Sequence, residues 1–362
     1  MVSGRYQELL LIPPLVPSFV SPLQSWLLVL AACGLDRLLG DPHGVLHPVQ
    51  LMGAAITQLR RWAEAWAGDQ PLRLRLAGGL ITLLVVGASL LAGWAVESLA
   101  LAWPLLGLPL LLLGLASALA GRSLEQAVEA VLRALPDTAL ARQRLAWIVG
   151  REVSGLDNGE ILRAAAETAS ENAVDGLFAP LFWMLVGAAL WGAAPLAVEP
   201  LTLRPQGLEL AYPGPLALAW GFKAASTLDS MLGYRRGRLA WLGTAGARLD
   251  DLLTWLPCRL VAMSLPLAAA RPDRSLAWFW GALQQGASDP SPNAGVSQAA
   301  YALATGVRLG GTNRYADGLR TKPLLVPLNP AADVESVKRM LRLSTRLELI
   351  WLLASGLVLA LA

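Results

Sequence analysis

Three long stretches of this 362-residue chain contain no charged residue, and they constrain the fold more than any other feature. They run from Ala77 to Val96, from Ser98 to Gly121 and from Ala179 to Val198. A helix needs about 20 mostly apolar residues to cross the hydrocarbon core of a bilayer. Each stretch reaches that length, so the sequence predicts membrane-spanning helices and an integral membrane protein.

Composition supports this prediction. Charged residues make up 15% of the chain, whereas about 25% is usual for a soluble domain. The 14 tryptophans far outnumber the 5 phenylalanines, and tryptophan favours the membrane–water interface. A soluble protein with a large apolar core is the alternative, and the span lengths disfavour it. The net charge is +3 without a long basic run, so we expect no nucleic acid partner.

We predict a single all-α, polytopic integral membrane domain over residues 1–362. It would contain about five to six spanning or re-entrant helices, with helical segments on the cytoplasmic side. Glu97 and Pro104 divide the second and third spans, which predicts a helical hairpin with a short turn. The charged residues 122–176 predict a polar helical segment. Pro257 and Arg259 favour a re-entrant or interior-facing helix at the sixth position. The predicted spans lie near residues 20–35, 77–96, 98–121, 179–198, 210–222, 252–270 and 347–362.

Arginine counts predict the orientation. The loop at residues 36–76 holds five arginines, whereas the turn between the second and third spans holds no lysine or arginine. Cytoplasmic loops of membrane proteins carry the excess of lysine and arginine. We therefore expect residues 36–76 and 122–176 on the cytoplasmic side, and the orientation beyond residue 222 stays open.

Four segments contain most of the unusual polar residues, and the first follows the first span. It holds Asp41 and both histidines of the chain, His43 and His47. Imidazole and carboxylate together are suitable metal ligands. A hydrogen-bonded turn that caps the span explains the same residues equally well.

The second segment places acids at Glu167, Glu171 and Asp175, four residues apart. A helix aligns them in one stripe, where each like-charge pair costs about 0.2–0.5 kcal/mol. A bound cation would offset this cost, and Mg²⁺ held through carboxylates and phosphate oxygens is the natural candidate. The alternative is a solvated helix face on which Arg163 pairs with Glu167.

The third and fourth segments mix acids, bases and amides. Lysine and arginine suit phosphate groups, and aspartates suit a metal, although internal ion pairs would use the same residues. Gly310 and Gly311 allow a close backbone approach to an anion, or simply a turn. The third segment contains Lys223, Asp229, Arg248, Asp250, Asp251 and Arg259, and the fourth contains Asn293, Asn313 and Lys322.

Together the four segments resemble the CbiB/CobD family, adenosylcobinamide-phosphate synthase. The resemblance lies in DRLLGDPHGVLHPVQLMG from Asp36, AAAETASENAVDGLFAPLFW from Ala164, KAASTLDSMLGYRRGRLAWLGTAGARLDDLL from Lys223 and SPNAGVSQAAYALATGVRLGGTNRY from Ser291. These motifs occur in the family's order and cover most of the chain. One departure is Ser226, because the family commonly has Asn before Thr-Leu-Asp-Ser-Met, and any role of that amide is in doubt here.

The resemblance implies an ATP-dependent ligase of cobalamin biosynthesis. Adenosylcobyric acid, (R)-1-aminopropan-2-yl phosphate and ATP would give adenosylcobinamide phosphate, ADP and phosphate, with Mg²⁺ as cofactor. Threonine phosphate or ethanolamine phosphate remain alternative amine donors. The family also implies the bacterial cytoplasmic membrane, an active site facing the cytoplasm, contact with membrane lipid and association with other late cobalamin-assembly enzymes.

This reaction suggests roles for the polar residues. Predicted catalytic residues are Glu167, Glu171, Asp175, Asp229 and His47, although a structural role for His47 in its turn is equally compatible. Predicted metal ligands are Asp41, Asp250 and Asp251. Predicted substrate- and phosphate-binding residues are Lys223, Arg248, Arg259, Lys322, Asn172, Asn293 and Asn313.

Two other classes of function remain open. A transporter would place ionisable groups near the middle of the bilayer. Here the uncharged spans carry none, and the polar clusters flank the spans except near Arg259. A non-catalytic scaffold of corrinoid assembly would need no phosphate-binding clusters.

Overall fold

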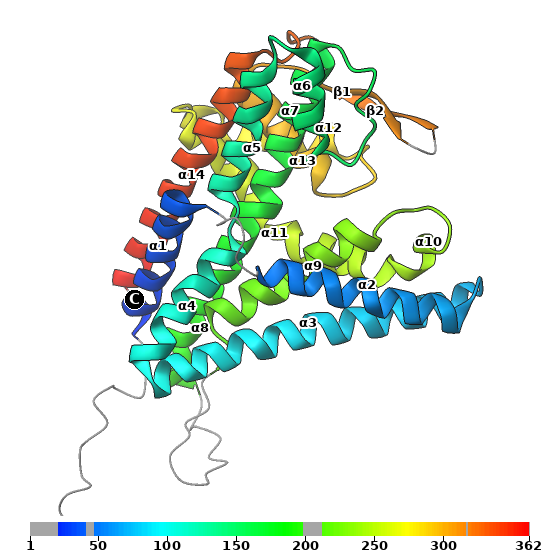
Figure 1. Ribbon diagram of the computed structural model, residues 1–362. Coiled ribbons are helices and arrows are strands. Elements are labelled where there is room, and N and C mark those ends of the chain that lie inside the picture. Colours follow the sequence, from blue (N-terminus) through cyan, green and yellow to red (C-terminus); the bar gives the residue numbers. More distant parts are fainter. Residues whose placement is uncertain (1–20, 41–46, 198–211, 316–317, 362) are drawn as a thin grey trace, which may run out of the picture.

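The computed structural model describes residues 21–40, 47–197, 212–315 and 318–361, and these are almost entirely helical (Figure 1). The first half of the chain forms α1 (Pro22–Leu39), α2 (Pro48–Ala67), α3 (Pro71–Ala102), α4 (Pro104–Ala118), α5 (Gly121–Ala134), α6 (Thr138–Ala146) and α7 (Asn158–Ala173). A π-helical turn, Val174–Phe178, joins α7 to α8 (Ala179–Ala197). The all-α prediction is confirmed.

The second half adds helices and one small sheet. It forms α9 (Pro215–Leu232), α10 (Leu239–Leu242), α11 (Thr244–Ala268), a 3₁₀ turn (Pro272–Arg274), α12 (Ser275–Gly286), α13 (Ala294–Thr305), β1 (Leu309–Tyr315), β2 (Gly318–Leu325) and α14 (Val334–Leu361). β1 and β2 pair antiparallel, with Asn313 opposite Arg320 and Gly311 opposite Lys322. This hairpin was not predicted from the sequence, in which Gly310 and Gly311 indicated a turn or a close backbone approach to an anion.

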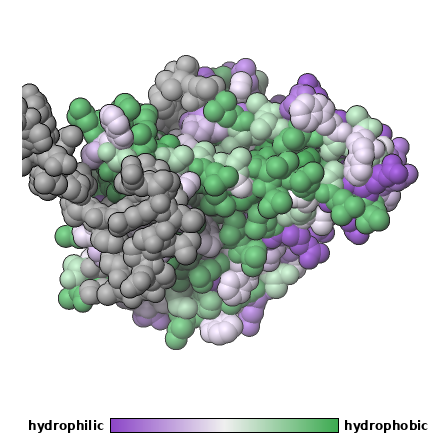
Figure 2. All heavy atoms as spheres, turned by 90° about the horizontal axis from the view of Figure 1, so that it is seen from below, coloured by the Kyte–Doolittle hydropathy of each residue, from purple (hydrophilic) through white to green (hydrophobic). Residues whose placement is uncertain are grey.

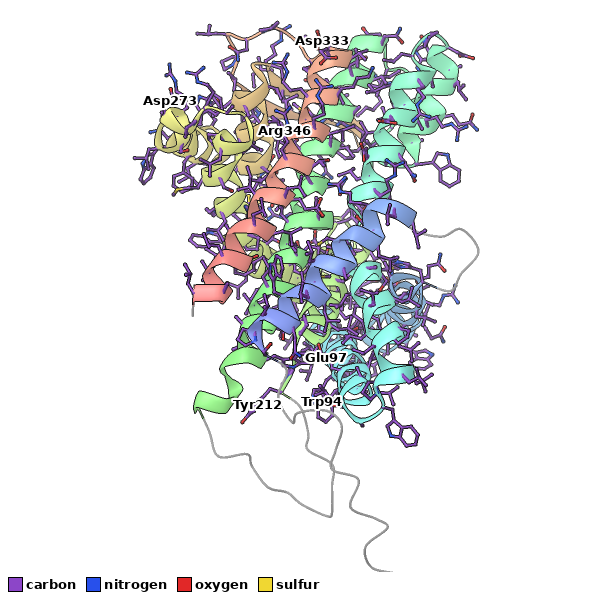
Figure 3. The ribbon with its side chains drawn as sticks, turned by 90° about the vertical axis from the view of Figure 1, so that its left-hand side faces the viewer. Trp94, Glu97, Tyr212, Asp273, Asp333 and Arg346 are labelled. Atoms are coloured by element: carbon purple, nitrogen blue, oxygen red, sulfur yellow. The ribbon has the colours of Figure 1, made fainter. Side chains whose placement is uncertain are left out.

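The helices form two regions that meet near the middle of the molecule. In Figure 1, α1, α4, α8 and α14 run together as a tilted bundle, while the long α3 crosses its base beside α2. The hairpin lies with α5, α6, α7, α12 and α13 at the other end. Figure 3 places Trp94, Glu97 and Tyr212 at the end opposite Asp273 and Asp333.

Proline and capping residues set where the helices begin. Proline is the first residue of α1, α2, α3, α4 and α9, a position where its missing N–H costs no helical hydrogen bond. Ser21 and Gln24 form a reciprocal capping box before α1. His47 does the same for α2, with its Nδ1 accepting from the Val49 N–H at 3.3 Å. His47 therefore has the structural role considered from the sequence, and its catalytic role stays a prediction.

Glu97 is buried inside α3 and does not mark a turn. Its carboxylate accepts hydrogen bonds from the backbone N–H groups of Gly214 (2.8 Å), Leu216 (2.6 Å) and Ala217 (3.1 Å). The predicted boundary at Glu97 is wrong, because this carboxylate satisfies the N-terminus of α9 within the protein. The break between α3 and α4 lies at Trp103 instead.

Close packing between α3 and α9 depends on a small residue. A Cβ added to Gly93 would lie 2.7 Å from the Cα of Ala217. Such a separation is shorter than real contacts allow, so glycine lets the two helix backbones meet. Small residues of this kind are typical of helix interfaces in membranes.

Length and composition qualify three helices as membrane spans: Pro22–Leu39, Pro71–Ala102 and the continuous helix Asn158–Trp191. A fourth is counted if α4 and α5, bent by 40°, act as one span. Figure 2 shows a broad apolar surface across the face seen from below. The polytopic membrane prediction is confirmed. The described helices that meet this test are fewer than predicted, because α9, α11 and α14 carry more polar residues.

The polar segment predicted at residues 122–176 is not separate from the span that follows it. α7 continues through the π-helical turn into α8, so its acids lie on the same helix as the span. Four predicted spans begin or end on residues outside the described part of the chain, namely residues 20, 198, 210–211 and 362.

Candidate active site

The acidic stripe lies on a helix that is mostly buried. Asp157 and Glu160 form a capping box that starts α7, and alanines then pack its buried face. At Val174 the helix widens into a π-helical turn, in which the N–H of Ala179 donates to the Val174 carbonyl. Single π-helical turns are frequent at functional sites. This turn contains Asp175, the last acid of the stripe.

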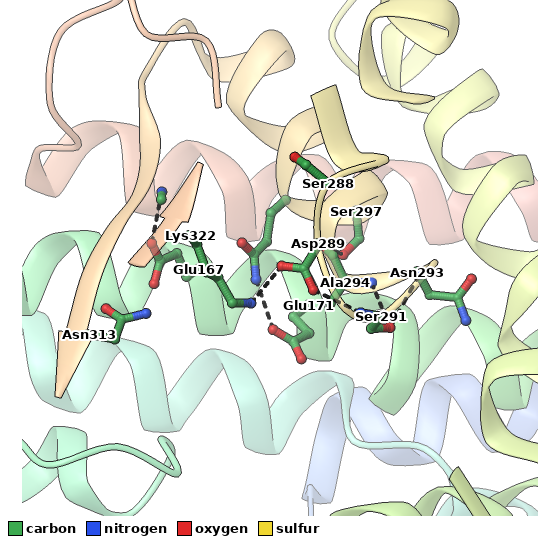
Figure 4. A network of polar contacts seen from close by, with 12 residues as sticks. Glu167, Glu171, Ser288, Asp289, Ser291, Asn293, Ala294, Ser297, Asn313 and Lys322 are labelled. Atoms are coloured by element: carbon green, nitrogen blue, oxygen red, sulfur yellow. Dashed lines mark hydrogen bonds and ion pairs between the residues drawn. The ribbon is translucent and has the colours of Figure 1, made fainter. Parts of the chain in front are cut away.

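Glu167 is engaged by the protein itself. Its carboxylate accepts hydrogen bonds from Arg151 at 2.5 Å, from Arg163 at 3.5 Å and from the Gly310 N–H at 3.0 Å. The same two arginines donate to the side-chain oxygen of Asn313. The pairing of Arg163 with Glu167 that we considered from the sequence is therefore present. This network ties the β-hairpin to α7, and Figure 4 shows Glu167 on the helix and Asn313 on the neighbouring strand.

Glu171, one turn further along α7, faces a different group of side chains (Figure 4). Gln298 of α13 donates to its carboxylate at 2.9 Å. Lys322 of β2 forms an ion pair with Asp289 at 2.7 Å. Burial lowers the pKa of Lys322, but the nearby carboxylates of Asp289 and Glu171 outweigh it and the pKa is raised. Lys322 thus stays protonated beside Glu171.

Asp175 lies close to aspartates of two other helices. Its carboxylate repels those of Asp250 on α11 and Asp229 on α9, and Lys223 partly balances them. Burial, Asp229 and Asp251 raise the pKa of Asp250 to about 8. Burial, Asp251 and Glu171 raise the pKa of Asp229 to about 6. The helices therefore bring together acids that are up to 80 residues apart, and among them the raised pKa of Asp250 keeps this carboxyl protonated near neutral pH.

Gly233 leaves room for the side chain of Asp229. A Cβ added to Gly233 would lie 2.0 Å from Oδ1 of Asp229. The side chain of Asp229 therefore folds back over the end of α9, where only glycine leaves room. The backbone N–H of Gly233 donates to the Asp229 carbonyl at 2.7 Å and ends the helix.

The loop between α12 and α13 closes one side of the acid cluster. Arg259 donates to the Asn293 side chain at 2.5 Å and to the Pro292 carbonyl at 2.8 Å. Asn293 donates to the Asp251 carbonyl at 2.9 Å, and Ser291 donates to the Asp251 carboxylate at 3.3 Å. The predicted residues Asn293 and Arg259 thus fix the loop against α11.

Several predicted site residues lie apart from this cluster. Asn172 is exposed, and Asn313 is buried beside Arg151. Arg248 is also exposed, but its charge acts on Asp251 at the edge of the cluster. Asp41 and His43 lie outside the described residues. Among described residues, no three His, Cys, Asp or Glu side chains converge closely enough to hold a metal by themselves. Of the predicted metal ligands Asp41, Asp250 and Asp251, only the last two lie in the described part of the chain.

Sequence reasoning missed Arg151, Ser291 and Gln298. Arg151 lies in the loop before α7 and contacts partners 16 and 162 residues away. Gln298 is a buried amide on α13, a helix of mostly small and apolar residues. A glutamine among mostly small and apolar residues is a signal that could have identified it, because a buried amide needs a partner.

Comparison with known proteins identifies the family. The model of the family described as CobD/Cbib protein matches residues 29–344. The chain belongs to the CobD/CbiB family. It is 37% identical to cobalamin biosynthesis protein CobD of Synechocystis over 94% of this chain and 93% of that protein. It is 36% identical to CbiB of Salmonella choleraesuis, over 88% of this chain and 93% of the relative, and 38% identical to CobD of Geobacter metallireducens, over 83% and 87%.

No solved structure matches the chain. The four sequence motifs lie on α1 and α2, on α7 and α8, on α9 to α11, and on α13 and β1. The last three of them meet around Glu171, Asp250 and Asn293.

Proposed function

We propose that this CobD/CbiB protein is a membrane-bound, ATP-dependent ligase that forms an amide between adenosylcobyric acid and (R)-1-aminopropan-2-yl phosphate in cobalamin biosynthesis. The observation that carries the proposal is the meeting of Glu171, Asp175, Asp229 and Asp250 with Lys223 and Lys322, far apart in sequence. Amide formation with ATP needs both kinds of group, because phosphates need cations and the amine needs a base.

The proposed chemistry has two steps. The carboxylate oxygen of the corrinoid attacks the γ-phosphorus of ATP, giving an acyl phosphate and releasing ADP. The amine nitrogen then attacks the acyl carbon, a carboxylate base removes its proton, and inorganic phosphate leaves. Glu171 is our candidate for the base, since it is half-buried and accepts only one protein hydrogen bond in the described structure.

Lysine and arginine side chains would hold the phosphates. Lys223 lies among the aspartates and Lys322 beside Glu171, so two phosphate groups could bind on either side of the acids. Arg259 would act indirectly, since its guanidinium already binds the loop at Pro292 and Asn293. Arg248, which is exposed on α11, remains a candidate for the outer part of the site.

The acid cluster fits a magnesium ion by the chemistry of its donors. Oδ1 of Asp250 is buried without a hydrogen-bond partner among the described residues. Mg²⁺ in ATP-dependent enzymes is usually held by one or two carboxylates together with substrate phosphates and water. Asp250 with Asp251 or Asp229 would supply the protein ligands, and the ion would neutralise phosphate charge. Asp41 remains a further candidate.

The pocket beside Lys322 and Gln298 is only about the size of one water molecule. We therefore propose that the large corrinoid binds on the open side of the cluster. The arginine-rich α2–α3 segment supports a cytoplasmic-facing site in a bacterial cytoplasmic membrane. Other late cobalamin-assembly enzymes are the proposed partners there.

The test is product formation by the purified protein. Adenosylcobyric acid, ATP and Mg²⁺ would be supplied with aminopropanol phosphate, threonine phosphate or ethanolamine phosphate, and the amide detected by mass spectrometry. We expect a product that needs ATP and falls at least 100-fold in Glu171→Gln and Asp250→Asn. Asp273→Asn, an exposed carboxylate on the 3₁₀ turn, is the matched control and should keep full activity.

A folded protein that forms no amide with any of the three amines would refute the ligase. A transporter would instead move a corrinoid into vesicles without a new covalent product, and a scaffold would do neither.

A further inference from the structure

One part of the molecule carries more positive charge than the whole chain. We define the basic arm as residues 48–76, which contain α2 and the start of α3, together with residues 233–242, which include α10. These segments lie together, since α2 and α10 both pack against α3 (Figure 1). The arm contains seven arginines and two acids, a local charge of +5, whereas the chain has a net charge of +3. The arginines are Arg60, Arg61, Arg73, Arg75, Arg235, Arg236 and Arg238.

Both acids of the arm are already paired within it. Glu64 accepts from Arg60 at 2.7 Å, and Asp69 accepts from Arg238 at 2.7 Å. The excess of five positive charges therefore lies on arginines that are exposed to the surroundings. An excess of this size attracts anions, and its effect is screened by salt.

Aromatic rings hold several of these arginines in place. The guanidinium of Arg75 lies 4.4 Å from the ring centre of Trp241, and that of Arg73 lies 5.7 Å from the ring of Trp66. Trp62 and Trp66 are themselves about 60% exposed. A stacked arginine loses less freedom when its planar guanidinium binds a phosphate.

The arm lies where α3 becomes apolar. After Arg75 the helix has no charge until Glu97, and its exposed residues there include Leu76, Leu80 and Leu83. Figure 2 shows the apolar surface ending in hydrophilic residues at its right-hand end, which corresponds to the tip of α2 and α3 in Figure 1. Tryptophan and arginine at such a boundary are typical of the membrane–water interface.

We propose that the basic arm binds the phosphate groups of anionic phospholipids at the membrane–water interface. Arg61, Arg73 and Arg75 would bind lipid phosphates, while the rings of Trp62 and Trp66 enter the interface. A membrane is favoured over an acidic protein or nucleic acid because the charges adjoin the apolar surface of α3. Each arginine near an anionic bilayer contributes roughly a fivefold gain in affinity.

The experiment compares lipid binding by two triple variants of the full-length protein. Arg61→Gln/Arg73→Gln/Arg75→Gln removes three exposed charges from the arm. Arg144→Gln/Lys338→Gln/Arg339→Gln removes three exposed charges at the other end of the molecule and is the matched control. Native mass spectrometry in a mild detergent would measure bound phosphatidylglycerol and phosphatidylcholine at several concentrations.

We expect wild type and control to prefer phosphatidylglycerol, and the arm variant to bind it at least tenfold more weakly. Equal phosphatidylglycerol binding by the two triple variants would overturn the proposal. Displacement of lipid by inorganic phosphate at constant ionic strength, or tighter binding of polyglutamate or duplex DNA than of lipid, would overturn it in favour of another anion.

A second measurement covers the case in which the arm variant does not fold. In nanodiscs, tryptophan fluorescence of the wild type should be quenched more by brominated phosphatidylglycerol than by brominated phosphatidylcholine. Trp62→Phe/Trp66→Phe should lose that difference while keeping the arginines. Equal quenching by the two lipids in the wild type would contradict the proposal. Neither measurement depends on ligase activity, so both remain informative if the proposed reaction is wrong.

Discussion

Glu167 and Glu171 lie one turn apart on α7, and the structure predicts opposite consequences for their replacement. Glu167 is 4% exposed and accepts hydrogen bonds from two arginines and a backbone N–H. Glu171 accepts one hydrogen bond from an uncharged amide. We infer that Glu167 mainly stabilises the hairpin, whereas Glu171 acts on substrate.

The loss of stability expected for Glu167→Gln follows from the surroundings of Glu167. The side chain of Arg151 is 8% exposed, so losing the carboxylate leaves a buried guanidinium without its counter-charge. Breaking a buried ion pair in this way costs about 3–5 kcal/mol. An unfolding entropy of about 2.1 cal/mol/K per residue gives roughly 0.76 kcal/mol/K for the chain, so Tm should fall by about 4–7 °C.

Thermal unfolding in detergent, followed by tryptophan fluorescence, measures this difference. Glu167→Gln should lower Tm by that amount and keep substantial activity at low temperature. Glu171→Gln should change Tm by about 1 °C or less and abolish amide formation. The reasoning fails if Glu167→Gln unfolds like wild type, or if Glu171→Gln is equally unstable. In a double-mutant cycle with Arg151→Gln, most of the stability lost in Glu167→Gln should appear as the interaction energy between the two residues.

Three further predictions concern other buried groups. Glu97→Ala should lower the free energy of unfolding by about 1–3 kcal/mol, because it leaves N–H groups of α9 without an acceptor. Glu97→Gln should recover part of this, and equal thermal stability of both variants with wild type would contradict it. Gly233→Ala should displace the Asp229 carboxylate, so that kcat falls while Tm changes little. An unchanged kcat would argue against a role for Asp229. Because folding raises the pKa of Asp250 to about 8, the native state binds the extra proton and stability should fall as pH rises toward 8. Asp250→Asn should have a flatter Tm profile between pH 6 and 8, and parallel profiles would refute this.

The membrane spans could be predicted from sequence because they depend on local composition. An uncharged stretch such as residues 77–96 has few places to lie other than a bilayer or a large core. The boundary at Glu97 was wrong for the opposite reason. Its partners are N–H groups near residue 215, so a distant helix end decides that this acid is buried. Local composition carries no information about such a partner.

The acidic stripe was predicted from its spacing, but its division of roles depends on tertiary contacts. On an ideal helix Glu167, Glu171 and Asp175 would face one cation together. Instead the hairpin engages Glu167, Gln298 contacts Glu171, and the π-helical turn carries Asp175 toward the aspartates of α9 and α11. The hairpin itself is stabilised by Arg151 and Arg163, which lie on other segments.

The same division explains why the site can hold so many acids near a membrane span. If Glu167, Glu171 and Asp175 formed one isolated stripe, burial would leave three mutually repelling carboxylates. Two arginines neutralise the first, Lys322 lies beside the second, and the last belongs to a cluster in which Asp250 keeps its proton at neutral pH. Binding of a magnesium–nucleotide complex at Asp250 would therefore release a proton. Proton uptake by the buffer, measured by calorimetry in buffers of different ionisation enthalpy, should be lost in Asp250→Asn. Equal proton release by that variant would place the ion elsewhere.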